Sequence, residues 1–112
     1  MTDAKDDPNP APAVRNLERL LQYQEASIVS RVLAKNAGGT VTLFAFDRGE
    51  GLSEHTAPFD ALVVAVDGEA EIAISGAPFR LRAGDTLLLP ANQPHAVRAD
   101  HRFKLLLIML RA

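Results

Sequence analysis

The sequence predicts an all-β domain, a sandwich or barrel of about eight short antiparallel strands that follows one short helix. Turn-forming residues recur at short, regular intervals between residues 36 and 94, and the segments between them alternate apolar and polar side chains or are rich in β-branched residues. No helical spacing of apolar residues follows residue 23. The chain has 112 residues, 47% of them hydrophobic and 23% charged, which is the composition of one globular domain.

The N-terminal segment differs from the rest of the chain. Residues 1–13 combine three prolines with three aspartates and contain no aromatic residue, so we expect a disordered tail there and one domain over residues 14–112. Val14, Leu17, Leu20 and Leu21 then fall three or four positions apart, which predicts a short helix that ends near Tyr23.

The first two strands form a predicted hairpin. Residues 28–33 and 40–46 are rich in β-branched and aromatic side chains, and residues 36–39, Asn-Ala-Gly-Gly, connect them. The remaining strands are expected at residues 62–66, 70–74, 79–82, 86–89, 95–98 and 103–110. In this scheme Asp67 and Gly68 form a turn between two separate strands.

The alternation of apolar and polar residues along each strand indicates which face is exposed to solvent. Glu69 and Glu71 share one strand face, opposite Ala70, Ile72 and Ile74, so we expect the two carboxylates to be solvated. The same reasoning assigns a solvated role to the basic residues of the C-terminal half: Arg80, Arg82, Arg98, Arg102 and Lys104. Residues 61–66 and 105–110 are apolar on both faces, which is typical of central strands in a two-sheet stack or of a dimer interface.

Composition excludes several classes of function. The longest apolar runs have six residues, far fewer than the roughly 18 that a membrane-spanning helix needs. The first residues contain no apolar segment after a basic start, so we expect no secretory signal and a cytoplasmic protein. The absence of cysteine excludes disulfides and thiolate metal sites. The net charge of −2, with no basic run, argues against nucleic-acid binding.

The region from Gly49 to Gly68 resembles the first motif of the cupin superfamily. In that motif a glycine is followed by two histidines, a glutamate and a second glycine at fixed spacing. Here Gly49, His55 and Gly68 occupy their positions, whereas Ala57 stands for the second histidine and Ala61 for the glutamate. The spacing is complete, but two of the motif's metal ligands are missing.

The second cupin motif is matched further along the chain. Gly84, Pro90 and His95 occupy motif positions, Asn92 replaces a glycine in a turn that either residue can form, and Ala99 replaces the final asparagine. The resemblance implies the double-stranded β-helix, or jelly-roll barrel, of a small single-domain cupin of the RmlC-like, conserved-barrel type.

The resemblance also implies a site at the centre of the barrel. His55 and His95 inherit its ligand positions, and they are the candidate catalytic and metal-binding residues. By strand alternation and motif position, Ala57, Ala61, Val63 and Val97 are expected to line the cavity.

Asp60 is a candidate third metal ligand. Two histidines and one carboxylate are the ligand set of non-haem iron sites, with nickel, zinc or manganese as alternatives. Alternation from His55 places Asp60 on the opposite face, so it could join the histidines only if the chain bends at Pro58. Without it, two imidazoles would bind a divalent metal weakly.

Three functions remain open from the sequence. The first is binding of a small molecule between the two histidines, with or without a divalent metal. The second is a metal-independent isomerase or epimerase in which histidine is the base. The third is a non-catalytic binding or sensing module. We also expect a homodimer, formed through the apolar C-terminal strand with Val14, Leu17 and Leu21.

Overall fold

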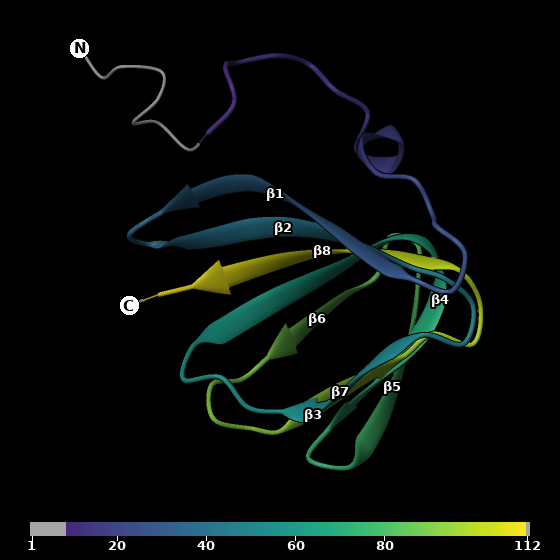
Figure 1. Cartoon of the computed structure of the whole chain (residues 1–112). Helices are drawn as coiled ribbons and strands as arrows, with labels where there is room; N and C mark the ends of the chain where they lie inside the picture. Colours follow the sequence, from purple (N-terminus) through teal and green to yellow (C-terminus); the bar gives the residue numbers. More distant parts are fainter. Residues whose placement is uncertain (1–8, 112) are drawn as a thin grey trace.

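The computed structural model of the chain describes residues 9–111, which form a barrel of two packed β-sheet layers (Figure 1). The larger layer contains β1, β2, β8, the first part of β4 and β6, and the smaller layer contains the rest of β4 with β5, β7 and β3. The elements are η1 (Leu17–Leu20), β1 (Ile28–Asn36), β2 (Gly39–Phe46), β3 (Gly51–His55), β4 (Asp60–Ile74), β5 (Ala77–Arg82), β6 (Thr86–Leu89), β7 (His95–Arg98) and β8 (Phe103–Leu110). All strand pairs are antiparallel, so the predicted all-β jelly roll is confirmed.

Strand β4 belongs to both layers, which corrects the prediction of two strands separated by a turn at Asp67 and Gly68. Its first part pairs with β6 and β8, and its second part pairs with β5 and β7. The register shifts between Ala65 and Asp67, and Gly68 has a positive φ of 73°. A side chain at Gly68 would overlap the carbonyl oxygen of Arg102. The turn-forming residues therefore bend a continuous strand, because a neighbouring backbone passes too close for any other residue.

The β1–β2 hairpin is confirmed. Asn36 pairs with Gly39, and the Asn36 side-chain oxygen accepts a hydrogen bond from the Gly38 amide at 2.7 Å, an Asx turn that closes the connection. Both strands run further toward the turn than the sequence pattern indicates. A bulge between Val32 and Ala34 lets β1 keep its pairing with β2 to the end.

The core lies between the layers and is densest at the end where Phe46 and Phe103 meet. Both rings are fully buried, with centroids 6.2 Å apart. Ala99, Ala70 and Leu81 close this end around them. This arrangement follows from the alternation of side chains along each strand, which directs one apolar row of every strand inward.

The predicted N-terminal helix is wrong in extent and type, because only the 3-10 turn η1 forms. In an α-helix the Glu18 and Leu20 carbonyls would accept hydrogen bonds from amides four residues onward. Here Lys104 Nζ donates to the Glu18 carbonyl at 2.6 Å, and Arg31 donates to the Leu20 carbonyl at 3.0 Å. These contacts from the sheet replace the helical bonds, so the segment lies extended across the outer face of the larger layer.

Lys104 is also a correction to the predicted solvated strand face, since it is only 6% exposed. Its ammonium lies 4.8 Å from the centre of the Tyr23 ring, and the Tyr23 hydroxyl donates to Asp67 at 2.5 Å. Burial, followed by the bond to Asp67, raises the pKa of Tyr23 far above its usual value, so the phenol keeps its proton. This polar cluster fixes the N-terminal segment against the barrel.

Residues 9–13 are exposed and contain neither helix nor strand, and the Asn9 side chain accepts a hydrogen bond from the Lys35 amide. Residues 1–8 of the predicted tail lie outside the described part of the chain. Within that part, no helix has the length and apolar character needed to cross a membrane.

Candidate functional site

Two histidines that are 40 residues apart in sequence meet at one end of the barrel. His55 is the last residue of β3 and His95 the first of β7, and the antiparallel register pairs them directly. Their Nε2 atoms are 3.1 Å apart, and the ring centroids are separated by 4.3 Å at an angle of 67°. The cavity-facing row of the smaller layer therefore ends in an imidazole pair.

Backbone carbonyls orient both rings. The Nδ1 atom of His55 lies 3.0 Å from the Ser53 carbonyl oxygen, and that of His95 lies 3.3 Å from the Gln93 carbonyl oxygen. Because a carbonyl oxygen can only accept, we assign the ring proton to Nδ1 in each neutral histidine. The two Nε2 lone pairs then point at each other across 3.1 Å, an arrangement that a shared proton or a bound cation stabilises.

Electrostatics keep one member of the pair neutral. Partial burial lowers the pKa of His95 below its usual 6.5, and the positive charge of protonated His55 lowers it further, while the Gln93 carbonyl opposes both effects. His95 is therefore an unprotonated imidazole at neutral pH. Its Nε2 lone pair is available as a base or as a ligand.

The pair lies beside a small apolar cavity of about 40 Å³. Apart from His55 and His95, its lining side chains are Phe44, Phe46, Leu52, Val63, Leu89, Val97, Leu105 and Leu107. The volume accommodates a water molecule or a group of a few heavy atoms. Within residues 9–111, the histidines are the only polar side chains in this lining.

The predicted lining residues divide into two sets. Val63 and Val97 line the cavity. Ala61 is buried but lies outside the lining, and Ala57 lies in the loop after β3, where its carbonyl accepts a hydrogen bond from the Asn92 amide at 2.8 Å. The lining residues absent from that prediction all follow the period-two alternation of their strands; they are Phe44, Phe46, Leu52, Leu89, Leu105 and Leu107.

Asp60 does not join the histidines. Its Oδ1 accepts a hydrogen bond from the Ala91 amide at 2.8 Å, and it faces out of the barrel because the next residue, Ala61, faces in. Residues 9–111 contain no group of three or more His, Asp or Glu side chains arranged to hold a metal ion. Pro58 therefore does not supply the bend that a third ligand required.

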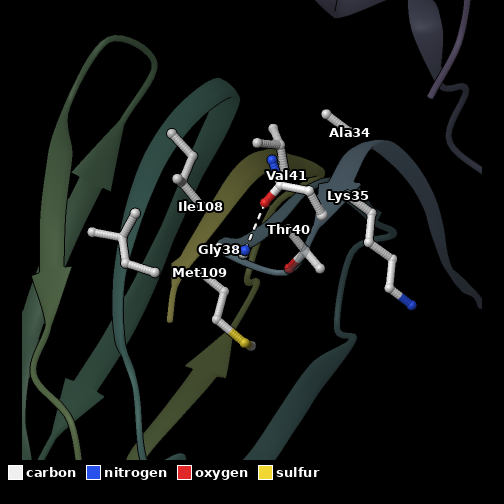
Figure 2. A pocket seen from close by; sticks show the side chains of 10 residues that line it. Ala34, Lys35, Gly38, Thr40, Val41, Ile108 and Met109 are labelled. Carbon is white, nitrogen blue, oxygen red and sulfur yellow. Dashed lines mark hydrogen bonds between the residues drawn. The ribbon is translucent and has the colours of Figure 1, made fainter. Parts of the chain in front are cut away.

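A larger depression of about 250 Å³ lies at the end of the β1–β2 hairpin, beside the end of β8 (Figure 2). Lys35 is the one titratable side chain among its lining residues, and the lining contains no histidine or carboxylate that could act as a base beside Thr40. The smaller cavity is the better candidate site because it alone combines enclosure with the imidazole pair.

The fold and the paired histidines define a small jelly-roll protein with a central apolar cavity. A family model of the cupin domain matches residues 42–109, and the chain belongs to the cupin family. A search of curated proteins finds no match.

Solved structures agree with this assignment. A conserved protein of unknown function from Streptococcus pyogenes is 30% identical, with a TM-score of 0.86, and the match covers 92% of this chain and 90% of that one. A cupin superfamily protein from Desulfitobacterium hafniense is 32% identical, with a TM-score of 0.86 and coverage of 93% and 95%. A cupin 2 conserved barrel domain protein from Leptotrichia buccalis is 42% identical, with a TM-score of 0.84; the match covers 87% of this chain but only 47% of that protein.

Proposed function

We propose that this cupin domain binds a small molecule at the open end of its barrel, with the imidazole pair as the polar contact. The observation that carries the proposal is the 3.1 Å separation of two Nε2 atoms beside an otherwise apolar cavity. Binding sites commonly combine an apolar lining with a few convergent polar groups.

The dimensions of the cavity set the size of the ligand. A space of about 40 Å³ receives only a short group, such as a methyl, a carbonyl or a hydroxyl with its carbon. His55 is exposed, so the rest of the ligand can extend past it toward solvent. The proposed ligand is therefore a small hydroxy or carbonyl compound that inserts one end.

The same pair could move a proton. A neutral His95 accepts a proton at Nε2, and the facing His55 Nε2, 3.1 Å away, is within reach to share it. A hydroxy-carbonyl compound at this position could be isomerised by removal of the proton from the carbon that bears the hydroxyl, transfer of the hydroxyl proton to the carbonyl oxygen, and return of the first proton to the former carbonyl carbon. This acid–base activity is the catalytic form of the proposal.

A weakly bound divalent metal is the second candidate function. Two histidine ligands of one ion, each about 2.1 Å from it, are separated by about 3.0–3.4 Å when they are adjacent in its coordination shell. The observed 3.1 Å separation fits, and each Nδ1–H has the carbonyl partner that metal-binding histidines usually have. His55 and His95 would hold iron, nickel, manganese or zinc, which would supply a Lewis acid. Among residues 9–111 no third side chain joins the two histidines as a ligand, so binding would be weak.

The experiment is a thermal-shift and calorimetric comparison of the wild type with His55→Ala, His95→Ala and His101→Ala. The probes are a panel of small hydroxy acids, keto acids and aldehydes, and each of the four metal ions alone. His101 is the matched control, since it is exposed and contacts only Glu69 within the described residues. We expect ligand-dependent stabilisation in the wild type and in His101→Ala, and its loss in the other two variants.

Two outcomes contradict the proposal. One is equal stabilisation of all four proteins by the same compounds, which places binding elsewhere. The other is a panel in which neither compounds nor ions bind the wild type. Stabilisation by ions but not by organic compounds would favour the metal candidate.

A further inference from the structure

The outer face of the larger layer carries an unbroken apolar row. Strand pairing defines this row, which crosses the layer from β6 through β4, β8 and β2 to β1 and consists of Leu88, Leu62, Ile108, Val41 and Ala34. Directly paired residues share a face of the sheet. Val63 and Leu107, which adjoin Leu62 and Ile108 in sequence, line the cavity, so this Leu88 row points away from the barrel interior.

The rows on both sides of the Leu88 row are also apolar on the central strands. Val64 pairs with Leu106 on the side of the closed end, and Leu110 ends β8 on the other side. Leu88 is 51% exposed and Leu110 is 52% exposed. Two of the largest exposed apolar side chains of the protein therefore lie on one face.

The depression at the end of the β1–β2 hairpin is part of this face. Figure 2 shows that the side chains of Ala34, Val41 and Ile108 point to the same side of the sheet. All three line the depression, and Leu110 lines it as well. The face is therefore hollowed at its β1 side, where the small side chain of Ala34 ends the Leu88 row.

The N-terminal segment covers this face mainly toward the closed end (Figure 1). Lys104 and Arg31 donate hydrogen bonds to carbonyls of the segment, and Tyr23 donates to Asp67. Leu43, which pairs with Arg31 on this face, is completely buried. The segment also meets the β1 edge at the Lys35 amide. These contacts leave the Leu88 row uncovered on β4, β8 and β6.

The face is consequently stepped, with the N-terminal segment raised at one end and the apolar rows recessed at the other. A two-fold axis that runs across the strands would place the segment of each copy over the recessed rows of a second copy. Val14 of that segment is fully exposed and would contact the partner. The step is therefore complementary to itself.

The charges on the face fit the same symmetry. The Leu88 row has none, and the two rows beside it contain Arg31 and Asp60, which have opposite signs and lie on opposite sides of the Leu88 row. The axis brings the Arg31 side of each copy over the Asp60 side of the other. The exposed charges of the N-terminal segment, Arg15, Glu18 and Arg19, would lie at the rim.

The area of the face is sufficient for a stable dimer. Strands lie about 4.8 Å apart and rise about 3.4 Å per residue, so five strands and the eight residues of β8 define a face of about 24 by 27 Å. Two copies would cover about 1,300 Å² in total, which is within the range of specific interfaces.

We propose that this outer face binds a second copy of the chain, forming a two-fold symmetric dimer in which the sheets stack and the N-terminal segments fill the recesses. Homodimer interfaces are more apolar than other protein surfaces, which favours a second copy over an unrelated partner. The cavity beside His55 and His95 lies between the layers, so the dimer leaves it accessible.

The test is sedimentation equilibrium of the full chain from about 1 to about 200 μM, with Leu88→Glu and Leu110→Glu. We expect the wild type to be a dimer at the higher concentrations. Each substitution should raise the dimer dissociation constant at least about tenfold, because every dimer would bury the new carboxylate twice. Both side chains are half-exposed, so the monomer should tolerate the change, and circular dichroism checks its fold.

Val32→Glu is the matched control. Val32 is 55% exposed and lies in the same layer, but it pairs with Thr42, and Thr42 pairs with the cavity-lining residue Leu107. It therefore faces the opposite side of the sheet. The control adds the same charge and should leave the dissociation constant unchanged.

Three outcomes overturn the proposal. The first is a wild type that stays monomeric, in which case residues 1–8 of the same chain or a different protein would cover the face. The second is a dimer that neither Leu88→Glu nor Leu110→Glu weakens, because association would then use another surface. The third is equal weakening by Val32→Glu, which would indicate a general effect of added charge. Leu88 and Leu110 lie on different strands, so if one variant fails to fold, the other still decides the result.

Discussion

The two ends of the barrel are made by the same strands but differ in what their side chains do. At one end Phe46 and Phe103 are fully buried with their ring centroids 6.2 Å apart, and Ala70, Ala99 and Leu81 are buried in the same core cluster. At the other end the inward row of the smaller layer finishes in His55 and His95, and the small cavity beside them extends inward as far as Phe46. Packing at the closed end stabilises the fold. This stability offsets the cost of placing polar groups beside a cavity at the open end.

The largest expected effect tests the packing of the closed end. Phe46→Ala should lower the free energy of unfolding by about 3–5 kcal/mol, because it leaves a cavity among residues that cannot collapse into it. Phe79→Ala is the control, since Phe79 is 42% exposed, and it should cost much less. Urea unfolding of the wild type, Phe46→Ala and Phe79→Ala measures the two losses in the free energy of unfolding. Similar losses in both variants would contradict the assignment of the core to the closed end.

A smaller effect is expected where β4 bends next to that end. Gly68→Ala should destabilise by more than about 1 kcal/mol, because the new Cβ would overlap the Arg102 carbonyl and φ is positive. Gly76→Ala has the same kind of backbone, φ 83°, but open space around the Cβ. The difference between the two midpoints of denaturation isolates the close approach. Equal costs would mean that backbone strain alone matters at Gly68.

The smallest effect belongs to the open end and depends on pH. The pKa of His95 is lower in the folded than in the unfolded chain, so the unfolded state takes up a proton more readily. The His95 contribution to stability is complete above about pH 6.5 and is lost as the pH falls from there through the folded pKa. His95→Gln should flatten this part of the profile between about pH 5.5 and 7.5, and His101→Ala should not. If the free energy of unfolding of His95→Gln depended on pH as steeply as that of the wild type, burial of His95 would not be the cause of this pH dependence.

Much of the fold follows from local signals that tertiary contacts do not override. The Asn-Ala-Gly-Gly hairpin and the strand alternation depend on backbone and side-chain preferences within a few residues. The bend at Gly68 and the 3-10 turn depend instead on distant groups, the Arg102 carbonyl and the Lys104 ammonium. Local sequence carries no record of such partners, so a turn and a longer helix were the reasonable but wrong predictions.

Part of the candidate site could likewise be predicted from the sequence, and part of it could not. The cupin motif positions gave His55 and His95, and alternation explains why Asp60 faces away from them. The orientation of each imidazole could not be predicted, because it is set by the Ser53 and Gln93 carbonyls.

The position of β8 has a consequence for synthesis of the chain. This strand lies between β2 and β4 in the larger layer, and it pairs with both along its length. Every other strand emerges from the ribosome before it, so during translation β2 and β4 wait with unpaired edges and exposed apolar rows. Barrel closure therefore waits until residues 103–110 have emerged, and until they insert between β2 and β4 the nascent chain is prone to aggregation.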